Sequence, residues 1–265
     1  MWASPRTLLF LPLLLVCACN FGAEATADTD TTDTELPEDG PVHPVAAYPS
    51  LYDTDIPVDV ILRVRFNEHL DARSVDADDM VLHSGPINKW LMSYYEPVTR
   101  SLLVWPSSPL RAFADWRFVL PDGIRGIDGS DVTSRELTRF TTGENAASRL
   151  PYVRRTYDED VAPLLGSRCG ACHDGSAGAF AGLDLSSAQG MAHTAVNRQS
   201  TQYQGWEKIR PYMPGRSYLL FKVLPGGYTA GRRMPRTLDG IAPAEPLTTD
   251  EQQVLSDWIV GGAIF

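Results

Sequence analysis

Hydrophobic residues alternate with mostly polar ones between residues 58 and 66, which is the period of a strand with one buried face. The apolar positions of this run are Val58, Val60, Leu62, Val64 and Phe66. Further strands are predicted from the apolar run 102–105 and from Trp116, Phe118 and Leu120, and turn residues occupy 106–109 and 121–123. Short strands separated by turns at this spacing predict a β-sandwich of about 100 residues.

Helix signals occur in the second half of the chain. Thr156 precedes three acids that suit the positive end of a helix dipole, which predicts a helix over 156–165. Thr248 or Thr249 can cap a last helix, with an acid or amide three residues later completing a capping box. The apolar face of this last helix comprises Val254, Leu255, Trp258 and Ile259.

The first 19 residues predict an export signal. Arg6 supplies the positive charge, and the apolar core at 8–16 is shorter than the roughly 20 residues that a spanning helix needs. The core ends in Val-Cys-Ala-Cys, which resembles the lipobox of bacterial lipoproteins. The resemblance implies that Cys19, preceded by the small Ala18, is lipidated and that residues 1–19 are removed. An ordinary signal with two incidental cysteines is the alternative.

Charge separates the next segment from the rest. The chain has a net charge of −10, and residues 24–39 contain seven acids and no base. Residues 20–43 therefore predict a disordered acidic linker. No basic patch interleaved with aromatic residues indicates a nucleic-acid partner. The remaining length and 43% hydrophobic content predict two folded domains, at 44–145 and 146–265.

The motif Cys169-Gly170-Ala171-Cys172-His173 has the spacing of covalent haem attachment. Each thiol can add to one haem vinyl group, and the adjacent imidazole then reaches one face of the iron. The alternatives are an exported disulfide, a thioredoxin-like redox pair and half of a zinc site; the last two lack the βαβ setting or second Cys/His cluster that they require. The motif predicts one covalent haem c, bound by Cys169, Cys172 and His173, and export is consistent with attachment outside the cytoplasm.

The order of pieces in the first domain resembles the bacterial Ig-like domain of surface-layer and other cell-envelope proteins. The pieces are Pro49, 60–66, 67–71, 74–75, 102–105, 109–110, 123–124, 128–129 and 140–143. This resemblance implies an all-β sandwich that acts as a spacer or adhesion module. The lone His69 and His83 are expected at the surface, and Trp90, Trp105 and Trp116 in the core.

The second domain resembles the small cytochrome c domains of bacterial envelope proteins. The matching elements are 157–165, the Cys-x-x-Cys-His motif, 182–186, 214–219, 233–235, 247–248 and 258–263. The resemblance implies an all-α cytochrome c-like domain, so that the expected chain is a multidomain protein in which this domain follows the sandwich. The family's Met-Pro element implies Met234 as the second axial iron ligand. Met213 precedes the same residue type and is the rival, but the element that follows it starts a different helix in the resembling proteins.

Arginines surround the expected ligand. Arg232, Arg233 and Arg236 either pair with the haem propionates or face water. Trp206 and Tyr228 are further candidates for contacts with the propionates. A helix is expected after Ser186, with Met191 in the core and His193 at the surface.

Together these features predict a lipid-anchored monohaem cytochrome of the cell envelope. The residue after Cys19 is Asn20 and not the Asp associated with inner-membrane retention in some bacteria, which favours the outer membrane. The protein would transfer single electrons to an unidentified redox protein, without a small-molecule substrate and without enzymatic activity of its own. The alternatives are a haem-based sensor or haem enzyme subunit with a displaceable sixth ligand, and an envelope adhesion or scaffold protein.

Overall fold

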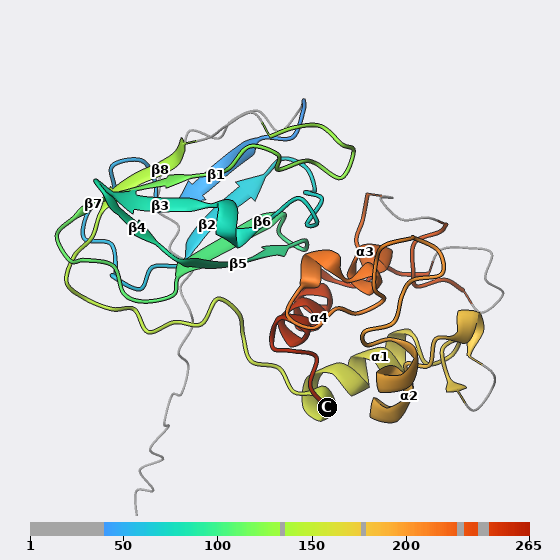
Figure 1. Cartoon of the computed structure of the whole chain (residues 1–265). Helices are drawn as coiled ribbons and strands as arrows, with labels where there is room; N and C mark the ends of the chain where they lie inside the picture. The colour runs from blue at the N-terminus through green and yellow to red at the C-terminus, as the bar shows by residue number, and fades with distance from the viewer. Residues whose placement is uncertain (1–39, 133–135, 176–178, 227–230, 238–243) are drawn as a thin grey trace, which may run out of the picture. The chain divides into compact units, whose positions relative to one another are not determined.

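The computed structural model describes residues 40–132, 136–175, 179–226, 231–237 and 244–265 (Figure 1). Its strands form two four-stranded antiparallel sheets, one in the order β1-β2-β6-β5 and the other in the order β4-β3-β7-β8. The strands are β1 (Pro44–Tyr48), β2 (Leu62–Phe66), β3 (Val81–Ser84), β4 (Ile87–Lys89), β5 (Leu91–Glu96), β6 (Ser101–Pro106), β7 (Asp115–Val119) and β8 (Glu136–Thr141).

The two sheets share one hydrophobic core. Along β2, Leu62, Val64 and Phe66 are buried while Arg63 and Arg65 are not, as expected for a strand with one face on a core. The opposite sheet contributes fully buried side chains to the same cluster, namely Leu82, Trp116, Phe118 and Phe140. The alternating pattern therefore predicted this sandwich correctly.

Two side chains of the sandwich differ from expectation. Trp90 is 77% exposed, whereas Trp116 is fully buried and Trp105 is half-buried. His69 is 6% exposed, with Nδ1 3.1 Å from the Tyr95 hydroxyl and its ring against Phe221. The expectation of a surface His69 was wrong because it considered the residue type alone. A hydrogen-bond partner lowers the free-energy cost of burying a neutral imidazole.

The predicted all-α cytochrome c-like domain over 146–265 is wrong. The chain consists mostly of β-sheet and irregular structure and is 22% helical. In the described residues after 146 the α-helices span only 6 to 12 residues each: α1 (Ala162–Arg168), α2 (Ala188–Thr194), α3 (Tyr218–Val223) and α4 (Thr249–Val260). A π-helical turn, η2 (Tyr157–Val161), and two 3-10 turns, η4 (Phe180–Gly182) and η5 (Pro214–Arg216), accompany them.

Proline and glycine residues lie at the start of α1 and on both sides of α3. Pro163 occupies the first turn of α1, and Pro214 and Gly215 precede α3. Pro225 follows α3, and proline cannot donate the backbone hydrogen bond that would continue a helix. The resemblance rested on short motifs in the right order, which do not determine how the segments between them fold.

The helix caps follow the local sequence. Thr156 accepts a hydrogen bond from the Glu159 backbone N–H, although the turn that it begins is π-helical. At α4 the Thr248 hydroxyl accepts from the Glu251 N–H at 3.2 Å, and the Glu251 carboxylate accepts from the Thr248 N–H at 2.7 Å. This reciprocal pair decides the capping box in favour of Thr248 over Thr249.

Helix α3 is buried on two sides. Its residues Tyr218 and Phe221, with Leu224 just beyond it, belong to the hydrophobic cluster of the sandwich. Leu220 and Val223 belong to a second cluster, which also contains Leu165 of α1 and Leu255, Trp258 and Ile259 of α4. The sandwich and the helices thus pack into one compact unit.

Residues 1–39 lie outside the described residues, and with them the expected signal at 1–19, the lipid site Cys19 and most of the linker at 20–43. In the described part of the chain, no helix is long and apolar enough to span a bilayer.

Candidate functional site

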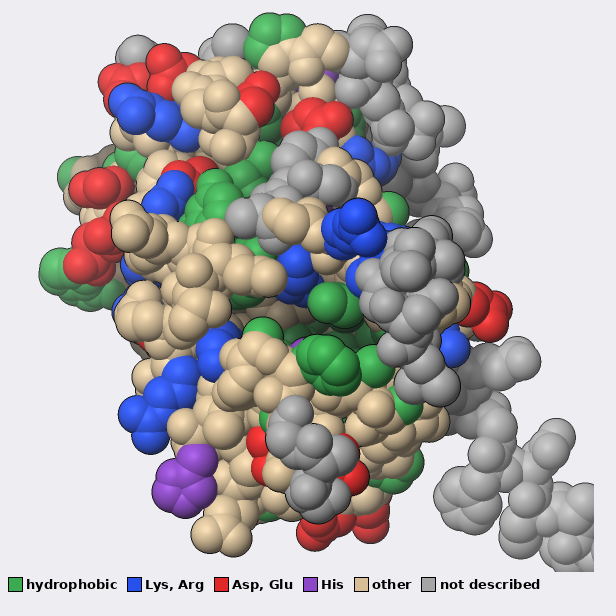
Figure 2. Space-filling view, turned by 90° about the vertical axis from the view of Figure 1, so that its right-hand side faces the viewer, with side chains coloured by type: hydrophobic (Ala, Val, Ile, Leu, Met, Phe, Trp, Pro, Cys, Tyr) green, Lys and Arg blue, Asp and Glu red, His purple; other side chains and the backbone are tan. Residues whose placement is uncertain are grey.

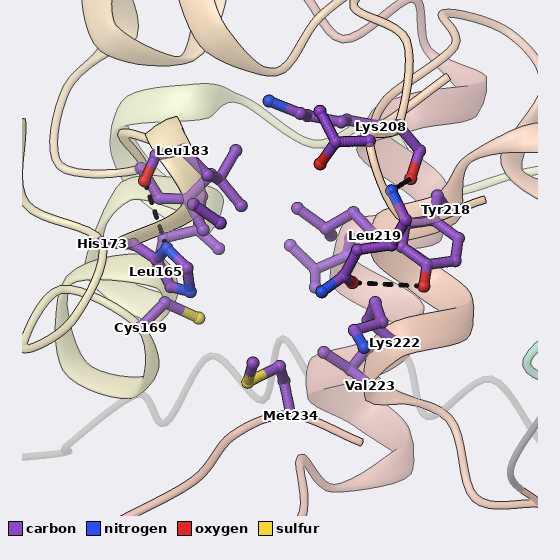
Figure 3. A pocket seen from close by; sticks show the side chains of 16 residues that line it. Leu165, Cys169, His173, Leu183, Lys208, Tyr218, Leu219, Lys222, Val223 and Met234 are labelled. Carbon is purple, nitrogen blue, oxygen red and sulfur yellow. Dashed lines mark hydrogen bonds between the residues drawn. The ribbon is translucent and has the colours of Figure 1, made fainter. Parts of the chain in front are cut away.

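A largely apolar cavity lies between α1, the segment after the cysteine motif, α3 and the segment that carries Met234 (Figure 3). It encloses about 800 Å³ free of protein atoms, including its solvent-filled mouth. A second hollow of about 990 Å³ shares Cys169, His173, Ala181 and Met234 with it, so the two spaces adjoin. Figure 2 shows hydrophobic side chains lining a hollow in the lower half of the face in view, with Lys and Arg side chains at its edges.

The end of α1 positions the first cysteine. The N–H groups of Cys169 and Gly170 both donate to the Leu165 carbonyl, at 2.8 and 2.9 Å. A Cβ at position 170 would lie 2.6 Å from the Gly166 carbonyl oxygen, so only glycine fits this close turn. The Cys169 side chain lines the cavity, and burial raises the pKa of its thiol to about 11.

The second cysteine lies on the adjoining hollow. The Cys172 N–H donates to the Cys169 carbonyl at 3.2 Å, and Cys172 lines the hollow together with Phe180 and Arg236. Both thiols are free, with no disulfide between them. The exported-disulfide alternative therefore finds no support in this geometry, and both sulfurs are available at one edge of the combined space.

His173 presents one ring nitrogen to the cavity. Its Nδ1 lies 3.1 Å from the Leu183 carbonyl. A carbonyl can only accept a hydrogen bond, so the Nδ1–H donates and the neutral ring keeps a lone pair on Nε2. Burial lowers the pKa of the imidazole, partly opposed by the backbone groups of Leu183 and Phe180. In Figure 3 the second nitrogen lies on the side that faces the cavity. A neutral imidazole oriented by a carbonyl is the form that binds a metal ion.

Met234 comes from a different part of the chain. Its N–H donates to the Lys222 carbonyl at 2.7 Å, and its half-buried side chain lines both the cavity and the hollow. Figure 3 shows its sulfur directed toward the side of the cavity that holds Cys169 and His173. Met213 is 39% exposed and lines neither space. The fold therefore brings Met234, and not Met213, to the cysteine motif.

One wall of the cavity, formed by residues 208–222, carries polar side chains that sequence reasoning missed. Lys208 and Lys222 both line it, and their ammonium groups donate to the carbonyls of Thr194 and Arg232 at 2.8 and 2.7 Å. Burial lowers the pKa of both amines. Tyr218 adds a hydroxyl to this wall. A lysine in the middle of the apolar run 218–224 was the one local signal that could have pointed here.

The other expected residues are placed as follows. Arg236 lines the hollow beside Cys172, whereas Arg232 and Arg233 line neither space. Trp206 is buried in the sandwich cluster, 4.9 Å from the Phe221 ring, and does not reach the cavity. Met191 is fully buried and His193 is exposed, as expected, and Tyr228 lies outside the described residues.

These groups fit a covalently bound haem. Two thiols lie at one edge of the space, an imidazole and a thioether face it from separate segments, and the walls are mostly aliphatic. The cationic side chains of Lys208 and Lys222, which line the cavity, suit the two propionates of the porphyrin. Within the described residues no group of three or more His, Cys, Asp or Glu side chains could hold a metal ion, so the zinc alternative finds no ligand set there.

Comparisons with known proteins add little. No family model matches the chain, and no curated protein matches it. Among solved structures, the N-terminal part of the bacterial S-layer protein SbsC matches 39% of this chain and 24% of its own length, with 10% identity and a TM-score of 0.32. An L,D-transpeptidase from Mycobacterium smegmatis matches 39% of this chain and 41% of its own length, with 15% identity and a TM-score of 0.27. This chain spans less than half of either protein, and matches this weak do not indicate a function.

Proposed function

We propose that this chain is a membrane-tethered monohaem c-type cytochrome that transfers single electrons in the bacterial cell envelope. The observation that carries the proposal is the convergence of Cys169, His173 and Met234 on one apolar cavity. The motif and the methionine are about 60 residues apart in the sequence, so their meeting is a property of the fold. A structural Cys-x-x-Cys turn has no need for a thioether on the cavity that its histidine lines.

Each residue has a distinct role in this proposal. Cys169 and Cys172 would form the thioether links, and His173 and Met234 would supply the protein ligands of the iron. A haem iron with these two ligands supplies reversible one-electron chemistry, at a potential that the methionine raises. The aliphatic walls, among them Leu165, exclude water, and Lys208 and Lys222 offer positive charge to the propionates.

Two protein ligands leave no iron position for a substrate, which favours electron transfer over catalysis. The redox partner is an envelope protein of unknown identity. The export signal and the lipobox-like Cys19 support attachment to the membrane by lipid chains, which bind it with roughly 0.8 kcal/mol per buried methylene. The acidic linker at 20–43 would separate the folded part from the membrane surface.

The test is to express the full chain in a host with haem-attachment machinery and to measure its intact mass and its pyridine haemochrome spectrum. We expect the mass of one haem, retained after denaturation. Cys169→Ser and Cys172→Ser should each remove one thioether link, whereas Cys17→Ser, in the expected signal, should leave haem content unchanged. A chain that matures without covalent haem in this host would contradict the proposal.

The same preparation separates the alternatives. A sensor or haem enzyme with a displaceable ligand would bind carbon monoxide readily in the reduced state, whereas a firmly bound Met234 should resist it. An adhesion or scaffold protein would carry haem that no small redox mediator can reduce and reoxidise. Reversible reduction without carbon monoxide binding is the result that we expect.

A further inference from the structure

We infer that Lys222 is a positioning residue for Met234, the proposed sixth ligand of the iron. Lys222 belongs to helix α3 and makes hydrogen bonds to the backbone of Arg232 and of Met234, so it binds this segment to the helix. This inference rests on the proposed function for its meaning, although the contacts themselves do not depend on it. Lys222 touches the backbone of the segment at two points, so its role differs from that of a lysine that only offers charge.

The two contacts use both ends of the residue. The Lys222 carbonyl accepts the Met234 N–H at 2.7 Å, and its Nζ donates to the Arg232 carbonyl at 2.7 Å. The side chain is 8% exposed and its ammonium group lies 5.6 Å from the centre of the Tyr218 ring. A hydrogen bond from a charged donor to a carbonyl is stronger than a neutral one, and more so away from water.

The end of the helix explains why this carbonyl is available. The last four carbonyls of a helix have no partner within it. Pro225 lacks an N–H and prevents a further turn after α3 ends at Val223. The Lys222 carbonyl lies in the last turn of α3 and can accept a hydrogen bond from outside the helix, which the Met234 N–H donates.

Helix α3 provides a fixed base for these contacts. Phe221 packs against the rings of His69 and Trp206, at 5.5 and 4.9 Å. On its other side, the Val223 carbonyl accepts a hydrogen bond from the Gln252 amide of α4 at 3.4 Å. A segment bound to a helix that is held on both sides has few alternative positions, which pre-organises the thioether.

The test compares three variants of the full chain. Lys222→Met keeps most of the aliphatic stem and removes the ammonium group, and Lys222→Arg keeps a charged donor. Lys89→Met is the matched control, because the Lys89 ammonium also donates to a carbonyl, that of Pro109 at 2.8 Å, but in the sandwich. Circular dichroism verifies that each variant is folded.

The first measurement is amide hydrogen exchange of peptides covering 231–237. We expect exchange at least about tenfold faster in Lys222→Met, near wild-type exchange in Lys89→Met, and substantial recovery in Lys222→Arg. Unchanged exchange in a folded Lys222→Met protein would overturn the inference. If Lys222→Met does not fold, Lys222→Gln replaces it. Equal amide exchange rates at 231–237 in Lys222→Gln and wild type would then overturn the inference.

The second measurement is an imidazole titration of the oxidised, haem-loaded protein. Imidazole competes with the thioether for iron, so a less well-positioned Met234 should let it bind about tenfold more tightly in Lys222→Met than in wild type or Lys89→Met. Equal affinities would also count against the inference. If the wild-type chain carries no haem, the proposed function fails, while the exchange measurement still decides whether Lys222 holds the segment.

Discussion

At the scale of single residues, two Met-Pro pairs compete for one role and only their surroundings distinguish them. Met234 is half-buried and lines the space next to His173, whereas Met213 is exposed and lies elsewhere. A thioether is a weak ligand that is effective only where the fold holds it in place. The chemistry of the side chain is the same in both cases, so its environment determines its function.

Met234→Leu should therefore keep the covalent haem and lose the sulfur ligand. We expect the weak far-red band of methionine-ligated oxidised haem to disappear and the midpoint potential to fall by on the order of 0.1 V, within the range of about 0.8 V that axial ligands span. Met213→Leu is the matched control and should leave both properties as in wild type. Optical spectra and a redox titration measure them, and a normal Met234→Leu spectrum would exclude this ligand.

His69 predicts a pH dependence of stability. Burial, reinforced by the charge of Arg100, lowers the pKa of His69 from 6.5 to about 4 in the folded protein. Above pH 6.5 the imidazole is neutral in both states, and below it the unfolded chain binds a proton that the folded chain resists. The contribution of His69 to the free energy of unfolding is therefore constant above pH 6.5, and it falls by up to about 3 kcal/mol as the pH drops to 4.

Denaturant unfolding of wild type, His69→Gln and His193→Gln between pH 7 and pH 5 tests this expectation. The amide of His69→Gln cannot be protonated, so the fall in unfolding free energy over this range should become smaller by about 1–2 kcal/mol. His193 is exposed and its substitution should leave the slope unchanged. Parallel slopes for all three proteins would show that another group causes the acid sensitivity.

At the scale of elements, each end of α4 depends on a few local contacts. The reciprocal hydrogen bonds of Thr248 and Glu251 satisfy backbone donors that the helix leaves unpaired. The C-terminal half is buried on several sides, with Trp258 2% exposed and its indole N–H donated to the Ile264 carbonyl at 2.9 Å. The cap sets where the helix begins, and the packing of Trp258 holds it against the second core.

Thr248→Ala should lower the unfolding free energy by about 1 kcal/mol, because it removes the N-cap oxygen. Thr249→Ala, one residue later and equally exposed, removes no cap and should change the unfolding free energy by less than about 0.5 kcal/mol. Chemical denaturation of the two single variants measures the difference. Equal losses would show that the capping box adds nothing to stability.

At the scale of the whole molecule, hydrogen bonds and apolar contacts join the sandwich to the helices. The Ser256 hydroxyl of α4 donates to the buried Glu96 carboxylate at the end of β5, at 2.9 Å. The Tyr94 hydroxyl donates to the Pro151 carbonyl, and Val260 of α4 packs with Tyr94 and Leu103. Such shared contacts couple the stability of the two parts.

We expect Ser256→Ala to lower the unfolding free energy by about 1–2 kcal/mol, because it leaves a buried carboxylate with one donor fewer. The loss should be the same whether unfolding is followed by amide exchange in β6 or in α4, since coupled parts unfold together. Ser167→Ala, at an exposed position of α1, should cost less than about 0.5 kcal/mol. A loss confined to α4 would show that the two parts unfold independently.

The sequence alone determined the features that depend on neighbouring residues. The alternation at 58–66 predicted a strand, although the regular strand covers only Leu62–Phe66, and the threonine-acid spacing predicted the cap of α4. The Cys-x-x-Cys-His motif needs only one turn of chain to bring its groups together, and the structure places that turn at the end of α1. These patterns act over a few residues, where propensity and spacing are sufficient.

Only the tertiary structure decided which distant residues meet. It placed Met234 rather than Met213 at the cavity, buried His69 and exposed Trp90. It also brought Lys208 and Lys222 to the cavity wall, and it replaced the expected all-α domain with short helices between irregular segments. Burial of a side chain and the meeting of separate segments depend on how whole elements pack. That packing is a sum of many weak long-range contacts, and no local pattern in the chain encodes it.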